Sequence, residues 1–293
     1  MSQPAPADVQ ALDALLRGDG YLPDRGLSTA AFIAMTLGRP ILLEGEVGVG
    51  KTEFAKTLAT IFSRRLIRLQ CYEGIDTNQA LYEWDYARQM LQIRALSEHE
   101  LTDDGSVDAL FGEKFLIERP LLEAVRAGDQ CVLLIDEVDR ADDEFEAFLL
   151  EVLSDFQVTI PEIGTIRAAS RPLVVLTSNR TRELHDALKR RCLYHWIDYP
   201  TAEREEEIVR VRIPDVPETL AVKAVAAVHR LRGLDLAKPP GVAETLDWGE
   251  ALRAIGASDL DVPIAADTLG AVVKDRDDLD VVNRRLGDIV RVD

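Results

Sequence analysis

Short apolar runs alternate with helical patterns along the chain as far as Pro200. Buried strands are predicted where apolar residues cluster, at 41–43, 66–69, 131–135, 173–177 and 192–197. Amphipathic helices are predicted between them, at 27–37, 52–62, 120–127 and 143–153. Buried strands separated by helices are typical of a parallel sheet that helices cover on both faces. We therefore predict an α/β core.

After Pro200 the strand-like runs end and only helical periodicity continues. Apolar stripes predict a smaller all-helical domain, with helices near 220–231, 242–255, 265–274 and 279–290. Residues 72–112 show no clear period and are interpreted as an insertion. The expected organisation is a flexible N-terminus over 1–20, an α/β core with hairpin insertions over 21–199 and a helical domain over 200–293.

Composition narrows the classes of function. Asp and Glu number 52 against 34 Lys and Arg, a net charge of −18 in 293 residues. Such a chain repels a phosphate backbone, so no nucleic-acid partner is expected. The three cysteines lie far apart and suit a reducing compartment rather than a disulfide framework. Because no signal peptide or membrane-spanning run is found, we expect a cytoplasmic protein that meets a membrane only through a partner.

A segment of eight residues follows the first predicted strand and matches the phosphate-binding motif G-x-x-x-x-G-K-[ST] in full. They are Gly45, Glu46, Val47, Gly48, Val49, Gly50, Lys51 and Thr52. A strand before the motif and a helix after it are the context that the motif needs. Its glycines let backbone N–H groups surround phosphates at the positive end of a helix, and its lysine binds the β- and γ-phosphates. We predict that these residues bind a nucleoside triphosphate and that the Thr52 hydroxyl binds Mg²⁺.

Polar side chains follow two further predicted strands. Asp136 and Glu137 come directly after the run 131–135, at the edge of a parallel sheet where ligands bind. We predict that Asp136 holds Mg²⁺ through water and that Glu137 accepts a proton from the attacking water. Asn179 ends the run 173–177, where an amide can orient that water, although asparagine also follows strands for reasons of turn geometry.

Three cations, Lys189, Arg190 and Arg191, end a predicted helix before the last strand. Cations suit the negative end of a helix dipole, and an arginine there can equally reach a phosphate bound by a neighbouring subunit. The spacing leaves both interpretations open. Cys192 and His195 have the C-x-x-H spacing of some metal sites, but residues three apart on a strand point to opposite faces, so packing in the core is favoured.

The order of these features resembles that of the AAA+ ATPases over about residues 20–290. The insertion at 72–112 and an alternating hairpin pattern at 156–167 resemble the MoxR branch of that family. Further segments are similar to CoxD-type ATPases, which are linked to maturation of a molybdenum–copper carbon monoxide dehydrogenase, at 69–74, 144–160 and 177–183. The resemblance implies a P-loop NTPase core with a helical lid domain, with ATP and Mg²⁺ as cofactors.

The resemblance also implies roles and partners. Arg191 would be the arginine finger and Asn179 the sensor, in a homo-oligomer that is typically a ring of six subunits. A client metalloenzyme and a von Willebrand A domain protein would be partners. One departure concerns the arginine that many AAA+ lids place at a helix start, because 242–248 contains none. Arg253 and Arg284 are the candidates to replace it, and the role stays unassigned.

The leading hypothesis is therefore an ATPase that drives chaperone-like remodelling or metal-centre maturation of a client enzyme. A small-molecule phosphotransferase is an alternative, but a tandem Asp136-Glu137 and a cross-subunit arginine suit hydrolysis in a ring better. A DNA-acting AAA+ motor is a second alternative, which the net charge and the lack of a DNA-binding module disfavour. A GTP switch is disfavoured because the chain has no N-K-x-D or T-K-x-D motif.

Overall fold

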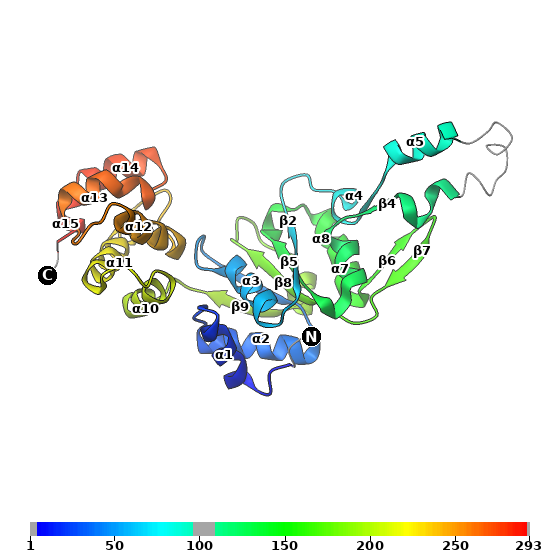
Figure 1. The fold of residues 1–293 in the computed structure, drawn as a ribbon, viewed down its shortest axis with the longest axis horizontal. Helices are drawn as coiled ribbons and strands as arrows, with labels where there is room; N and C mark the ends of the chain where they lie inside the picture. The colour runs from blue at the N-terminus through cyan, green and yellow to red at the C-terminus, as the bar shows by residue number, and fades with distance from the viewer. Residues whose placement is uncertain (1–4, 96–108, 292–293) are drawn as a thin grey trace. The chain divides into compact units, whose positions relative to one another are not determined.

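In the computed structural model, which describes residues 5–95 and 109–291, five strands form the central sheet (Figure 1). Their order is β2-β5-β8-β1-β9. The pairs β2–β5, β5–β8 and β1–β8 are parallel. The strand bounds are β1 Ile41–Gly45, β2 Arg65–Gln70, β5 Cys131–Asp136, β8 Leu173–Ser178 and β9 Leu193–Ile197. The predicted parallel α/β core is confirmed.

Helices cover both faces of this sheet, because its central strands are apolar on both sides. Leu133 and Ile135 of β5 share one apolar cluster with Leu121 and Leu149, which lie on the helices α7 and α8. On the other face α2 and α3 pack against β1 and β8. The helix bounds are α2 Arg25–Leu37, α3 Lys51–Ile61, α7 Pro120–Ala127, α8 Asp143–Asp155 and α9 Asp186–Arg191. Each predicted core helix is present, with ends that differ by a few residues.

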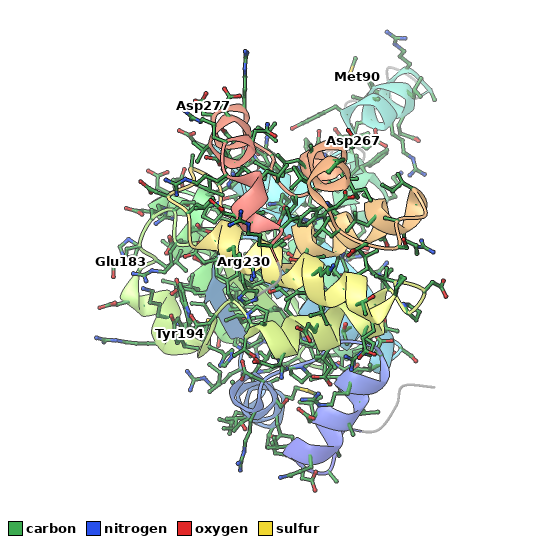
Figure 2. The ribbon with its side chains drawn as sticks, turned by 90° about the vertical axis from the view of Figure 1, so that its left-hand side faces the viewer. Met90, Glu183, Tyr194, Arg230, Asp267 and Asp277 are labelled. Carbon is green, nitrogen blue, oxygen red and sulfur yellow. The ribbon has the colours of Figure 1, made fainter. Side chains whose placement is uncertain are left out.

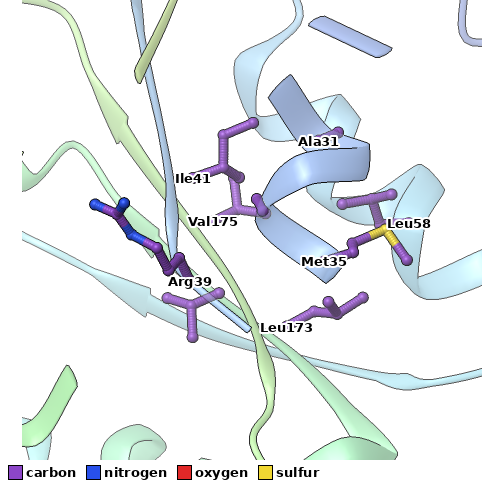
Figure 3. Close-up of a pocket in the computed structure, with 9 residues that line it drawn as sticks. Ala31, Met35, Arg39, Ile41, Leu58, Leu173 and Val175 are labelled. Atoms are coloured by element: carbon purple, nitrogen blue, oxygen red, sulfur yellow. The ribbon is translucent and has the colours of Figure 1, made fainter. Parts of the chain in front are cut away.

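A small recess, lined by apolar side chains and by Arg39, lies between α2, α3 and the sheet (Figure 3). Ala31 and Met35 of α2 line it with Leu58 of α3, and Ile41 and Val175 form its floor. Ile41 is the first residue of β1, so the recess lies near the amino ends of the strands. Ligands of parallel sheets bind at the opposite, carboxyl edge. The recess is therefore a packing defect away from the predicted site.

The two regions predicted as insertions form separate small sheets. The first contains the antiparallel pair β3 Tyr82–Trp84 and β4 Leu116–Glu118, with the helices α4 Thr77–Ala80 and α5 Tyr86–Ala95 beside it. Residues 96–108 of this predicted insertion lie outside the described residues. Figure 2 shows Met90 of α5 at the outer surface, where its side chain is largely exposed. The second is the hairpin of β6 Gln157–Ile160 and β7 Gly164–Arg167, as the alternating pattern predicts.

By their contacts the residues group into two units. The second unit holds Leu16–Pro23, Gly45–Lys51 and Trp196–Asp293, and the first holds the remainder of the chain. Trp248 is fully buried in the second unit and its indole N–H donates to Thr268 Oγ1 at 2.8 Å. The C-terminal region is helical, as predicted: α10 Ala202–Arg212, α11 Glu218–Arg232, α12 Val242–Ala254, α13 Val262–Thr268, α14 Arg276–Asn283 and α15 Leu286–Ile289. None of the described helices is both long and apolar enough to span a membrane.

The expectation of a flexible N-terminus over 1–20 is wrong for most of that segment. Val9–Gly18 forms the helix α1. Leu12 and Leu16 lie four residues apart on one face, and both side chains are fully buried. The Ala- and Pro-rich residues at the start of the chain suggested a loose segment, but the helix after them is amphipathic, and burial of its apolar face stabilises it.

Candidate functional site

The phosphate-loop motif joins the end of β1 to the first turn of α3, as the sequence predicts. Gly48 and Gly50 have φ angles of 79° and 96°, which favour glycine. The Lys51 ammonium donates to the carbonyl oxygens of Gly45 at 2.7 Å and Glu46 at 2.6 Å. Gly45 and Lys51 are buried, Glu46 and Val47 are exposed, and Gly48, Val49, Gly50 and Thr52 are partly buried.

The start of α12 lies directly against this loop. The Ala243 N–H donates to the Gly48 carbonyl at 3.1 Å, and a Cβ atom on Gly241 would lie 2.6 Å from the Val47 carbonyl oxygen. Only glycine therefore fits at 241. Glu244 accepts from the Gly241 N–H at 2.8 Å, so a capped helix start stands at the loop. Nothing in the sequence pattern marked Gly241, because its role depends on a contact far along the chain.

The carboxylate of Asp136, at the end of β5, is buried and accepts hydrogen bonds from three elements. Thr52 Oγ1 on α3 donates to it, with 3.0 Å to Oδ1, and Thr177 Oγ1 on β8 donates to Oδ1 at 2.5 Å. Arg68 on β2 binds Oδ2 through Nε at 3.0 Å and Nη2 at 2.6 Å. The sequence named Thr52 and Asp136 as separate candidate ligands of Mg²⁺, and Arg68 and Thr177 were missed. Their positions follow from the strand register of the structure, which pairs Gln70 with Asp136 and puts β8 on the other side of β5.

Glu137 leaves the strand in a left-handed conformation, with φ 55° and ψ 50°. This conformation is unfavourable for a residue with a side chain and is concentrated at functional sites. The Glu137 N–H donates to Thr177 Oγ1 at 2.9 Å, which fixes the turn. Its carboxylate receives the Gln70 amide at 3.1 Å, the Arg140 guanidinium at 3.1 Å and the Asn179 amide at 3.5 Å. The structure thus places Asn179, the residue expected to orient the attacking water, within 3.5 Å of Glu137.

Asp139 holds the segment that carries Asn179 in place. It is buried, and its carboxylate accepts the backbone N–H groups of Asn179 at 3.2 Å and Thr181 at 2.8 Å. The Thr181 hydroxyl also donates to it at 2.7 Å. Sequence reasoning missed Asp139, although it stands three residues after Asp136 in the same acidic run. Its hydrogen bonds connect the turn after β5 to the turn after β8.

Arg191 ends α9 and lies exposed at the surface of its unit. Within the described chain its guanidinium donates to Ser154 Oγ at 2.8 Å and to the Ala187 carbonyl at 3.2 Å, not to the acidic pair. The Arg39 guanidinium donates to the carbonyls of Arg190 at 2.6 Å and Arg191 at 3.1 Å. Arg39 thereby caps the helix end and holds the three cations in a fixed segment.

The donor set at Asp136 suits a hard cation. A hydroxyl and a carboxylate are ligands that Mg²⁺ accepts, and Mg²⁺ takes its remaining ligands from water and nucleotide phosphates. Among the described residues, no group of three His, Cys, Asp or Glu side chains could hold a metal ion by itself. Cys192 is buried, which raises the pKa of its thiol to about 12, and His195 binds the carboxylate of Asp24 at 3.1 Å. The interpretation of Cys192 and His195 as structural residues agrees with these contacts.

Comparison with known proteins adds a family match. Residues 40–192 match the family described as AAA domain (dynein-related subfamily). An uncharacterized protein of Staphylococcus saprophyticus is 26% identical over 183 residues, which cover 60% of this chain and 62% of that protein. The chaperone protein ClpB of Leptolyngbya boryana is 29% identical over 167 residues, which cover 57% of this chain and 16% of that protein. The chain thus spans less than two thirds of the length of these curated relatives.

A solved structure is also similar. The RuvB Holliday junction branch migration motor of Thermotoga maritima is 19% identical, with 87% of this chain and 69% of that chain covered and a TM-score of 0.47.

Thr177 offers a test of how this edge of the sheet is held together. Thr177→Val should lower the free energy of unfolding by about 1–3 kcal/mol, because the buried Asp136 carboxylate and the partly buried Glu137 N–H each lose a partner. Thr177→Ser keeps the hydroxyl and should restore most of that loss. Urea unfolding followed by circular dichroism measures both. Equal stability of Thr177→Val and the wild type would show that the hydroxyl does not support the acidic turn.

Proposed function

The chain belongs to the dynein-related subfamily of AAA domains, a family of ATPases that use ATP with Mg²⁺, and we propose that it hydrolyses ATP at the carboxyl edge of its sheet. The observation that carries this proposal is the hydrogen bond between Thr52 Oγ1 and Asp136, beside Glu137. Thr52 directly follows Lys51 in the phosphate loop, so ligands for phosphate and for metal are adjacent in the chain.

The roles of the residues follow from their chemistry. The loop N–H groups of 45–51 and the Lys51 ammonium bind the phosphates. Thr52 and Asp136 would hold Mg²⁺, which when bound offsets the negative charge of the phosphate oxygens. Glu137 accepts a proton from water as the water oxygen bonds to the γ-phosphorus and the bond to the bridging oxygen breaks. Asn179, 3.5 Å from Glu137, orients that water.

Within the family we assign the chain to the MoxR branch. The β6–β7 hairpin before β8 and the insertion at 72–112 support this assignment, since the branch places insertions there. The core would comprise 21–199 and the lid 200–293, with α1 added to the ordered part. Glu244 stands in the stretch where many AAA+ lids have an arginine, so this lid would act on the loop through backbone contacts instead.

The wider function we propose is chaperone-like remodelling of a client. Subunits would assemble into a ring, typically of six, in which Arg191 of one subunit reaches the nucleotide of the next. The similarity of a ClpB chaperone is in keeping with remodelling. The client would be a metalloenzyme, with a molybdenum–copper carbon monoxide dehydrogenase as the first candidate from the CoxD-like segments. A von Willebrand A domain protein would be a further partner.

The acidic pair should separate binding from turnover. Glu137→Gln should keep ATP and Mg²⁺ bound but lower the rate of phosphate release by about 10²-fold or more, because the amide cannot accept the proton. Asp136→Asn should instead weaken the Mg²⁺-dependent part of ATP binding. Calorimetric titration and a phosphate-release assay distinguish the two. Wild-type turnover in both variants would contradict the proposed site.

Arg191 tests whether a neighbouring subunit completes the site. Arg191→Ala should bind ATP normally but hydrolyse it roughly 10³-fold more slowly, since arginine fingers supply effects of that order. Specific activity of the wild type should also rise with protein concentration as subunits assemble.

Mixing variants sharpens this test. Arg191→Ala mixed with Glu137→Gln re-forms interfaces in which an intact Glu137 faces an intact Arg191, so some activity should return. Lys189→Ala and Arg190→Ala are the matched controls. If Arg191→Ala is fully active and Arg190→Ala is inactive, the arginine finger is Arg190 rather than Arg191. Activity per subunit that stays constant on dilution to a monomer would contradict the mechanism.

A further inference from the structure

Arg68 forms an ion pair that the proposed reaction does not use. It lies on β2, and its guanidinium binds Asp136 Oδ2 through two nitrogens, at 3.0 Å and 2.6 Å. The Asp136 side chain is 4% exposed whereas that of Arg68 is 50% exposed. A buried carboxylate therefore depends on a cation that reaches it from the surface.

The hydrogen-bond donors around Asp136 differ in how easily they can move away from its carboxylate. Thr177 is buried and also fixes the backbone of Glu137, so it cannot leave without disturbing the turn. Thr52 belongs to the first turn of α3 and stays at the site as a proposed metal ligand. Arg68 alone among these three donors is half exposed and carries a positive charge. A second cation that approaches Asp136 is repelled by the Arg68 charge, so it must share the carboxylate with Arg68 or displace Arg68 from it.

Arg68 also has a second place to bind. Its Nη2 donates to the amide oxygen of Gln70, two residues along the same face of β2. A guanidinium that leaves Asp136 thus keeps one hydrogen bond and enters water at little cost, because it is already half exposed. Arg65, on the same strand, pairs instead with Glu123 at 2.8 Å and makes no such contact with the acidic pair.

We infer that Arg68 is a counter-cation that competes with Mg²⁺ for Asp136 and so sets the Mg²⁺ concentration at which nucleotide binds tightly. The inference rests on the proposed function, in which Asp136 is the metal-binding carboxylate. Arg68 keeps the buried carboxylate paired when Mg²⁺ is scarce, and Mg²⁺ must displace this pair to bind. Arg68 is a positioning residue in this account, since it acts on the metal ligand rather than on the reacting atoms.

The test is ADP binding to the full chain as a function of added MgCl₂, measured by calorimetry, with an EDTA arm. Arg68→Gln should lower the half-saturating Mg²⁺ concentration by about three- to tenfold, the effect expected for a partly exposed ion pair. In EDTA the same variant should melt at a lower temperature than the wild type, because Asp136 loses its cation. Arg65→Gln, with the same change of charge on the same strand, should match the wild type in Mg²⁺ dependence.

The outcomes separate the alternatives. Arg68→Lys keeps the charge but offers one nitrogen, so its half-saturating Mg²⁺ concentration should fall between those of the wild type and Arg68→Gln. It replaces Arg68→Gln in the test if that variant folds poorly. An unchanged or higher Mg²⁺ requirement in both Arg68 variants overturns the inference. Weaker ADP binding by an equal factor with and without Mg²⁺ overturns it too, since Arg68 would then contact nucleotide. If the wild type binds ADP without any dependence on Mg²⁺, the proposed role of Asp136 itself fails.

Discussion

The buried carboxylate of Asp136 is the constraint around which the site is organised. Removing such a charge from water is costly unless donors replace the lost hydration. Here the donors come from α3, β2 and β8, as Thr52, Arg68 and Thr177. The strand order β2-β5-β8 is what makes this possible, because it puts a neighbour on each side of β5. Sheet topology and site chemistry therefore depend on one another.

The same hydrogen bonds extend from Asp136 to the rest of the edge. Thr177 binds both the Asp136 carboxylate and the Glu137 N–H, and so holds Glu137 in its left-handed turn. Asp139 then anchors the backbone of Asn179, whose amide lies 3.5 Å from Glu137. A polar network in which each member has a partner is rigid, and rigidity is what a positioned general base requires. The network accounts for why the acidic turn tolerates an unfavourable conformation.

Much of this was predictable from local pattern. The strands, the core helices and the hairpin follow from periodicity, and the phosphate loop follows from a complete motif in the right context. Helix α1 was missed although Leu12 and Leu16 lie on one apolar face of an amphipathic segment, because the Ala- and Pro-rich residues before it suggested a loose N-terminus. Arg68, Thr177, Asp139 and Gly241 were missed for a different reason. Their roles depend on which strands and loops become neighbours, and a single sequence does not encode that adjacency locally.

The most direct test of the central claim is whether a metal binds at Thr52 and Asp136 together with nucleotide. Mn²⁺ accepts the same oxygen ligands as Mg²⁺ and is visible by electron paramagnetic resonance. The account predicts that the wild-type chain binds Mn²⁺ when ADP is present, and that Thr52→Val, which lacks the hydroxyl, loses most of this bound signal. Equal Mn²⁺ binding by Thr52→Val and the wild type would contradict the account.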